Sequence, residues 1–185
     1  MGQRLLHHGL RFTMVRPAVF RALLRAGQAL RPWLPAQARE KVPLRKAADL
    51  TRPAVRHRRR VLMLEGCVQP ALSPATNAAA ARLLDRVGIS VTPAPAGECC
   101  GAIDFHLNAQ EQGLQRARRR IDAWWPAVEA GVEAIVIPAS GCAAFVREYA
   151  HLLAADPAYA AKAARVSSLC RDLVEVLGDA PIEQL

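Results

Sequence analysis

The sequence predicts an α/β protein, in which a small three-layer parallel sheet with flanking helices follows a basic helical or irregular leader. Two observations predict this class. From residue 61 onward, short apolar runs alternate with longer amphipathic segments, as in chains built from βαβ units. The excess of positive charge, in contrast, lies entirely before that point. With 185 residues, of which 52% are hydrophobic and 22% charged, the chain is long and apolar enough to bury a core.

Residues 1–60 form the basic leader. They hold 15 Lys and Arg against two acidic residues, a local net charge of +13, whereas residues 61–185 carry −4. The sequence pI near 10.2 is therefore a property of the leader, and we place a domain boundary between the leader and a cysteine-rich domain over 61–185. Prolines such as Pro17, Pro32 and Pro53 interrupt the leader, so one short amphipathic helix is expected there, around residues 19–30.

Four roles for the leader compete. A linker that docks on another part of a larger protein is favoured. For a nucleic-acid patch, the leader has the arginines but few aromatic side chains to stack on bases. For a membrane-surface helix, it has the basic amphipathic pattern. A transit peptide would be richer in serine. Arginines also interrupt every apolar stretch before it reaches the roughly 18 residues of a membrane span. We expect a docking linker and no nucleic-acid partner.

The first βαβ unit is expected between residues 61 and 92. Val61–Glu65 is a short apolar run of the kind that forms a buried parallel strand. Ser73 and Pro74 then supply an N-cap and a first helical residue, and Gly88 ends the helix. Ile89–Thr92 is the second expected strand.

A long helix is expected to begin near Asn108, where Glu111 completes a capping box. Pro126 should kink or split this helix, and Gly131 ends it. Ala134–Ile137 is the third strand.

Two more helices are expected, over about 142–153 and from about 156 to 177. The second of them would bury Cys170 on its apolar stripe. The order of the elements predicts a sheet of three parallel strands joined by right-handed crossovers.

Four of the five cysteines follow the three expected strands. Cys67 follows the first strand, Cys99 and Cys100 follow the second, and Cys142 follows the third. Loops beyond the carboxyl ends of parallel strands converge on one edge of the sheet, where ligands bind. We therefore expect the four thiols to meet at one place. Three loop glycines adjoin them, as where backbone passes close to a bulky inorganic group: Gly66, Gly101 and Gly141.

Four cysteine thiolates satisfy either an iron–sulfur cluster or a structural zinc ion, and their spacing alone leaves both open. Any single cysteine is more often an inert core residue, but four at strand ends favour a shared site. Disulfides are disfavoured, because nothing indicates secretion and the adjacent Cys99 and Cys100 pair poorly.

The cysteine pattern Gly66-Cys67, Cys99-Cys100-Gly101 and Ser140-Gly141-Cys142 resembles the CCG repeat of heterodisulfide reductases and of iron–sulfur subunits of flavin-linked dehydrogenases. Within that group the chain most resembles glycolate oxidase (glycolate dehydrogenase) iron–sulfur subunits. Four segments carry this closer resemblance, and together they are more specific than the cysteine spacing: Arg16–Leu23, Val61–Gly66, His106–Glu111 and Ile121–Pro126.

The resemblance implies a bacterial multisubunit enzyme that oxidises glycolate to glyoxylate. A flavin-containing dehydrogenase subunit with FAD would remove the hydride, and the iron–sulfur subunit, itself not catalytic, would pass electrons to a quinone or another acceptor. It also implies a cytoplasmic location, either free or peripheral at the inner face of the cell membrane. The isolated chain is expected to be inactive.

The chain departs from the complete family pattern in three ways. It lacks the cysteines of a ferredoxin-like domain, so the 4Fe-4S clusters of a full subunit are not encoded in it. It contains one CCG repeat where two are expected, so we interpret the chain as a fragment that covers the interdomain linker and the first repeat. Phe145 stands where a C-x-x-C ending would place another cysteine after Cys142.

Asp104 and His106 lie just after the CCG loop and are candidates for supporting or proton-transfer roles beside the thiols, although caps are the more common use of such residues. No glycine-rich phosphate loop follows any strand, so no flavin site of its own is expected. The leading hypothesis is an electron-transfer subunit. The alternatives are a structural module stapled by zinc or thiols, without a redox role, and a nucleic-acid-binding fragment driven by the leader.

Overall fold

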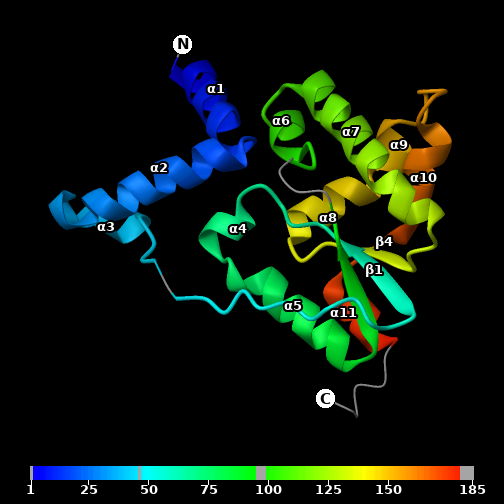
Figure 1. Cartoon of the computed structure of the whole chain (residues 1–185). Coiled ribbons are helices and arrows are strands. Elements are labelled where there is room, and N and C mark those ends of the chain that lie inside the picture. Colours follow the sequence, from blue (N-terminus) through cyan, green and yellow to red (C-terminus); the bar gives the residue numbers. More distant parts are fainter. Residues whose placement is uncertain (1, 46, 95–98, 180–185) are drawn as a thin grey trace.

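The computed structural model describes residues 2–45, 47–94 and 99–179, so the last predicted domain residues, 180–185, lie outside the described residues (Figure 1). It has four parallel strands in the order β2–β1–β3–β4. The α/β class and the three-layer arrangement are confirmed. The elements, in order, are α1 (Gly2–Met14), α2 (Pro17–Leu30), η1 (Arg31–Trp33), α3 (Ala36–Lys41), β1 (Arg59–Met63), α4 (Gln69–Leu72), α5 (Ala75–Arg86), β2 (Ile89–Pro93), α6 (Ala102–His106), α7 (Gln110–Glu129), β3 (Ala134–Val136), α8 (Ser140–Arg147), α9 (Tyr149–Leu152), α10 (Ala160–Leu169), β4 (Cys170–Arg171) and α11 (Leu173–Gly178).

Alternate residues of the central strands face opposite layers of helices. In β1, Val61 packs with the apolar residues of α5 and α11, whereas its neighbour Leu62 packs with those of α7, α8 and α10. The same alternation separates Ala134 from Ile135 in β3. All four of these side chains are at most 4% exposed, so both faces of the sheet are covered and the central strands form the core.

The sheet has a fourth strand that the sequence analysis missed. The last predicted helix is in fact α10, then the two-residue strand β4, then α11. Asp172 interrupts the helical stripe, because its side chain accepts a hydrogen bond from the backbone N–H of Val174 and forms a capping box with Glu175. Cys170 is buried as expected, but it lies on β4, paired with Ile135, and not on a helix.

Two expected helix boundaries were also wrong. Ser73 ends the short helix α4 and caps nothing, so α5 begins two residues later, at Ala75. Asn108 adopts a left-handed backbone with φ of 62°, and α7 begins only at Gln110 with no side-chain cap. Pro126 does not split α7, which is continuous over 20 residues.

The basic leader is more helical than expected and lies against the cysteine-rich domain (Figure 1). Helix α1 contacts α6 and α2 contacts α4, while the extended segment after α3 runs along α5 toward β1. Val15, between α1 and α2, is 4% exposed and belongs to the main core cluster. Within the described residues, no helix has both the length and the apolar character needed to cross a bilayer.

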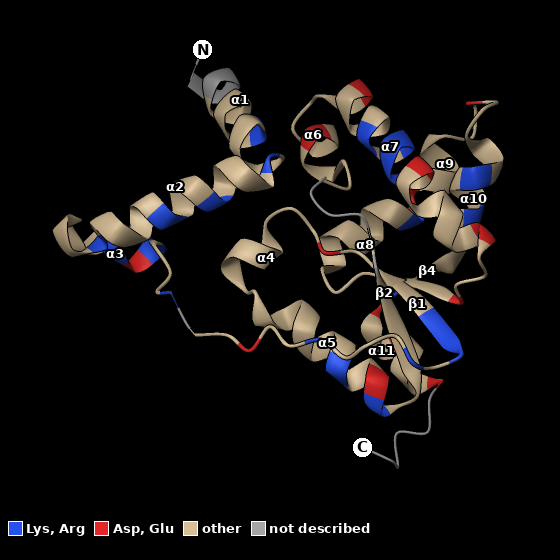
Figure 2. Ribbon diagram, in the orientation of Figure 1, with Lys and Arg blue, Asp and Glu red and all other residues tan. Residues whose placement is uncertain are grey.

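Ion pairs attach much of the leader to the domain. Lys and Arg residues lie along α2 and on the segment that leads into β1, and acidic residues of the domain face part of them (Figure 2). We call these ion pairs between leader and domain the leader seam: Arg11–Asp104, Asp49–Arg82, Arg52–Glu65, Arg56–Asp85, His57–Asp85 and Arg59–Glu133. The seam gives Arg11, Arg52, Arg56 and Arg59 of the leader an acidic partner within the same chain.

Candidate metal centre

The four predicted cysteines come from three elements at the carboxyl edge of the sheet. Cys67 lies in the turn after β1, Cys99 and Cys100 lie between β2 and α6, and Cys142 lies in the first turn of α8, after β3. Cys67, Cys99 and Cys100 are at most 6% exposed, whereas Cys142 is half-buried. The order of the sheet reverses between β1 and β3, which is the position where open α/β sheets bind ligands.

The four side chains interact in a row, which we call the four-thiol site. Hydrogen bonding links Cys67 to Cys99, Cys99 to Cys100, and Cys100 to Cys142. Cys99 accepts from its neighbours, chiefly Cys100, and this lowers the pKa of its thiol to about 3 in spite of its burial. The same bonding with Cys100 lowers the pKa of Cys142.

The pKa values of the other two thiols, Cys67 and Cys100, are raised. Hydrogen bonding with Cys99, followed by burial, raises the pKa of Cys67, and hydrogen bonding with Cys142 and Cys99 raises the pKa of Cys100 well above its usual range. The row therefore alternates between proton donors and thiolate-like acceptors. A backbone N–H of Gly101 also donates to the Cys99 sulfur at 3.5 Å, which favours the thiolate there.

The backbone around the CCG loop is tightly constrained. Gly101 has φ of 102°, and a Cβ added to it would lie 2.4 Å from the carbonyl oxygen of Gly113 on α7 and 3.1 Å from the ring of Phe145. The hydroxyl of Tyr149, which is fully buried, donates a hydrogen bond to the carbonyl oxygen of Cys100 at 2.5 Å. Burial raises the pKa of this tyrosine well above its usual range, so it stays a donor. These contacts hold the loop from two sides.

The three loop glycines have different roles. The close approach at Gly101 is to the backbone of α7, not to open space that a bulky group would fill. Gly66 has φ of 77°, which a turn immediately before Cys67 requires. Gly141 has an ordinary helical position, and a Cβ there would meet nothing within 4 Å. The expected close approach of Gly141 to an inorganic group stays a prediction.

Phe145 occupies the position of the absent second cysteine. It is 4% exposed, and its ring packs against Phe105, His106 and Tyr149 with centroid separations of 5.3 to 5.8 Å. It thus forms an apolar wall beside the CCG loop.

The donor set of the four-thiol site fits an iron–sulfur cluster or a zinc ion by its chemistry. Four thiols from three elements lie together, two of them already biased toward the thiolate form that binds metal. Among the described residues, however, no three His, Cys, Asp or Glu side chains already surround a common point as metal ligands do. Binding of a metal ion or cluster at this site would therefore replace the contacts between thiols with bonds from sulfur to metal.

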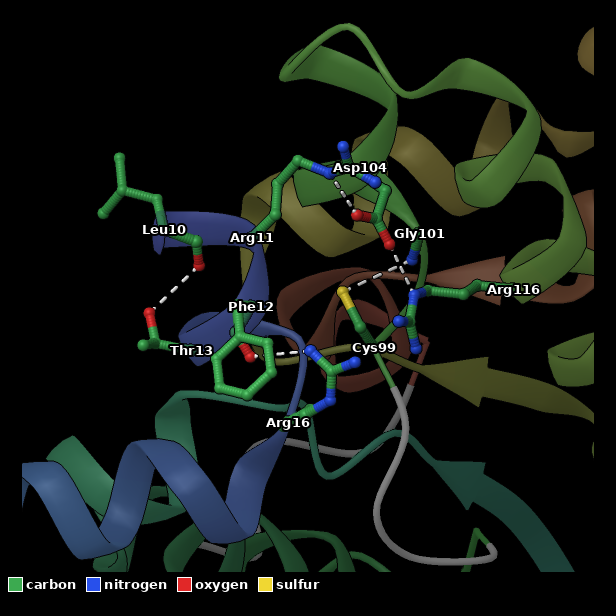
Figure 3. A network of polar contacts seen from close by, with 9 residues as sticks. All are labelled: Leu10, Arg11, Phe12, Thr13, Arg16, Cys99, Gly101, Asp104 and Arg116. Carbon is green, nitrogen blue, oxygen red and sulfur yellow. Dashed lines mark hydrogen bonds and ion pairs between the residues drawn. The ribbon is translucent and has the colours of Figure 1, made fainter. Parts of the chain in front are cut away.

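The two other predicted site residues lie apart from the thiols. Asp104, on α6, is 2% exposed and accepts hydrogen bonds from the Nε atoms of Arg11 and Arg116 at 2.7 and 2.5 Å (Figure 3). His106 is exposed and touches the rings of Phe105 and Phe145. In the part of the chain that the structure describes, neither Asp104 nor His106 hydrogen-bonds a thiol. Their supporting roles stay predictions.

Sequence reasoning missed two residues behind the site. Arg120, on α7, is 2% exposed and lies 5.8 Å from the ring of Trp124, while Tyr149 anchors the CCG loop. A polar residue on the apolar stripe of a helix is a recognisable signal, and Arg120 lies three residues after Ala117 and four before Trp124 on that stripe. The contact of Tyr149 with Cys100 spans 49 positions and has no local signal.

Comparisons with known proteins identify the domain. Residues 61–147 match the cysteine-rich (CCG) domain family. Over 99% of its length the chain is 61% identical to the glycolate oxidase iron–sulfur subunit of Escherichia coli K12. This chain is a relative of glycolate oxidase iron–sulfur subunits. The resemblance inferred from the sequence is confirmed.

Two further relatives are more distant. A probable glycolate oxidase iron–sulfur subunit of Bacillus subtilis is 32% identical over 69% of the chain, and the lactate utilization protein A of an Exiguobacterium strain is 29% identical over 63% of it. The chain spans 45% of the length of the E. coli protein and 28% of the B. subtilis protein. No solved structure matches the chain.

Proposed function

We propose that this chain is the electron-transfer part of a flavin-dependent glycolate dehydrogenase, with Cys67, Cys99, Cys100 and Cys142 holding an iron–sulfur cluster. The observation that carries the proposal is the row of pairwise interactions between the four thiols at the switch point of the sheet. The similarity to iron–sulfur subunits of glycolate oxidase supports the choice of an iron–sulfur cluster over zinc.

Oxidation of glycolate to glyoxylate releases two electrons and two protons. On this proposal they first reach the FAD of a partner subunit, and the electrons then leave one at a time through this chain toward a quinone or another acceptor. A bound iron–sulfur cluster would supply this one-electron transfer. The chain itself carries no catalytic residue in this scheme, and it would act in the cytoplasm or at the inner face of the cell membrane.

The residues around the site suit such a role. Burial of three thiols and the aromatic wall formed by Phe145 and Tyr149 keep water from most of the site. The hydrogen bond from Tyr149 fixes the backbone of the CCG loop, so the thiols keep their positions when the charge of the site changes. The leader seam attaches basic surface to the domain without using the thiols, which leaves helices α2 and α3 available to dock a partner subunit.

The test is the metal and sulfide content of the full chain purified without oxygen, together with visible absorbance and low-temperature electron paramagnetic resonance. We expect iron with acid-labile sulfide and a signal that responds to reduction. Each of C67S, C99S, C100S and C142S should lose most of the iron. The matched control is C170A, which removes the fifth cysteine, buried on β4 and outside the four-thiol site, and should keep the iron.

Two outcomes would contradict the proposal. One zinc per chain with no colour would favour the structural alternative, in which the four thiols staple three loops. No metal in the wild type, with the four serine variants as stable as C170A, would remove the metal site altogether.

A further inference from the structure

A cavity of about 240 Å³ lies between α1 and the α6–α7 pair. Arg11 and Arg16 line it from the leader, and Asp104 and Arg116 line it from the domain. Asp104 follows Gly101 by three residues, so the floor of the cavity and the CCG loop belong to one short segment (Figure 3). The function proposed above makes no use of this cavity.

The cavity is built around a buried carboxylate. The Asp104 side chain is 3% exposed, and each of its oxygens is bound by the Nε of one arginine, Arg11 on one side and Arg116 on the other. Because both arginines use Nε, their terminal nitrogens remain available. Within residues 2–45, 47–94 and 99–179, no hydrogen-bond partner is found for those nitrogens. Asp104 thus holds two guanidinium groups in fixed orientations.

A third guanidinium makes the cavity electropositive. Arg16 donates from Nη1 to the backbone carbonyl of Phe12 at 3.0 Å and lies 4.3 Å from the centre of its ring, which holds it in place at the cavity wall. Three arginines against one carboxylate leave a net charge of +2. The ion pairs of Asp104 with Arg11 and Arg116 are enough to attach α1 to the domain. The third positive charge, on Arg16, therefore indicates a ligand.

The size and charge select the class of ligand. A cavity of about 240 Å³ lies below the roughly 300–1,000 Å³ that hold drug-sized molecules, so the ligand is small. Guanidinium groups bind carboxylate and phosphate oxygens through paired N–H donors. We propose that this cavity binds a small dianion, a dicarboxylate or a phosphate, through Arg11, Arg16 and Arg116, and so fastens α1 of the leader to the cysteine-rich domain.

Calorimetric titration of the full chain tests the proposal, with malonate and inorganic phosphate as probes at constant ionic strength. Acetate is the matched monoanion. We expect one saturable site for malonate, phosphate or both, and acetate binding at least about tenfold more weakly, because a second charge-assisted contact is lost. The dianion that binds more tightly shows whether planar carboxylates or a tetrahedral phosphate fit the three arginines.

R16Q is the decisive variant, because Arg16 is exposed and bonds the carbonyl oxygen of Phe12, so the ion pairs of Asp104 with Arg11 and Arg116 stay in place. It should weaken dianion binding about tenfold. R25Q removes the same charge from an exposed position on α2, outside the cavity, and should change binding less than twofold. R116K keeps the charge but loses the planar fork, and it should weaken binding while preserving the ion pair to Asp104.

Several results would overturn the proposal. These are no saturable binding of either dianion, acetate binding as tightly as malonate, or R25Q weakening binding as much as R16Q. The last result would show only a general attraction of anions to the basic leader.

Discussion

The four-thiol site and the leader seam hold the molecule together in opposite ways. The thiols are almost all buried, come from three elements at one edge of the sheet, and hydrogen-bond to one another. The seam consists of arginine or histidine side chains paired with carboxylates and mostly half-exposed, such as Arg59–Glu133 with side chains 41% and 35% exposed. Buried contacts set the geometry of the candidate centre, whereas the exposed pairs mainly position the leader. Asp104, three residues after Gly101 of the CCG loop, is the buried member of the seam.

The largest effect is expected from G101A, which breaks the packing of the CCG loop itself. An alanine there would take a left-handed φ and bring its Cβ within 2.4 Å of the Gly113 oxygen. We expect the free energy of unfolding to fall by about 3–5 kcal/mol in urea titrations.

G141A is the matched control for G101A. Its Cβ meets open space in the first turn of α8, so its stability should equal or slightly exceed that of the wild type. If both variants were equally stable, the close packing of the CCG loop on α7 would be refuted.

A smaller loss is expected from D104N, which sharpens the comparison at the junction of the two regions. Removing the charge of Asp104 leaves Arg11 and Arg116 facing each other without a carboxylate. The cost should be about 2 kcal/mol, less than for a fully buried pair because both arginines are about a fifth exposed.

The control for D104N is D49N, at an exposed carboxylate of the leader that pairs with Arg82 at 3.2 Å. Its effect on the urea midpoint should be too small to resolve. A loss from D49N as large as that from D104N would mean that exposed pairs hold the leader as firmly as the buried carboxylate does.

The smallest effect is expected from D85N, which breaks the seam at Arg56 and His57. Hydrogen bonding from Arg56 lowers the pKa of Asp85 below its usual value, with a smaller contribution from His57. The folded protein therefore binds this proton less readily than the unfolded chain, so the stabilisation is present above pH ~4 and is lost as pH falls toward the lowered pKa. Urea midpoints measured between pH 7 and pH 3 should fall more steeply for the wild type than for D85N. Parallel curves would show that Asp85 is not tied to the leader.

The sequence predicted most of the candidate site because the site follows from topology. Once Val61–Glu65, Ile89–Thr92 and Ala134–Ile137 are recognised as parallel strands, the cysteines that follow them must meet at one edge. The boundaries were harder. The strand β4 has only two residues, of which one is charged, so no pattern distinguishes it from the helix before it.

Contacts between distant positions could not be predicted, because no local sequence pattern indicates them. Arg11 and Asp104 are 93 positions apart, and nothing in either segment indicates that they pair. The helical content of the leader was underestimated for a related reason. Pro17 begins α2 at a position where proline is favoured, although prolines in the leader were interpreted mainly as helix breakers.

Phe145 has a consequence for the direction in which electrons could travel. On the side of Phe145, Phe105 and Tyr149, any redox group held by the thiols would face hydrocarbon, which insulates it from solvent and from a docking subunit. Cys142 is the half-buried member of the four, at the start of α8. Cys142 is therefore the thiol that lies closest to solvent, and the first turn of α8 is the face of the site that a redox partner could approach.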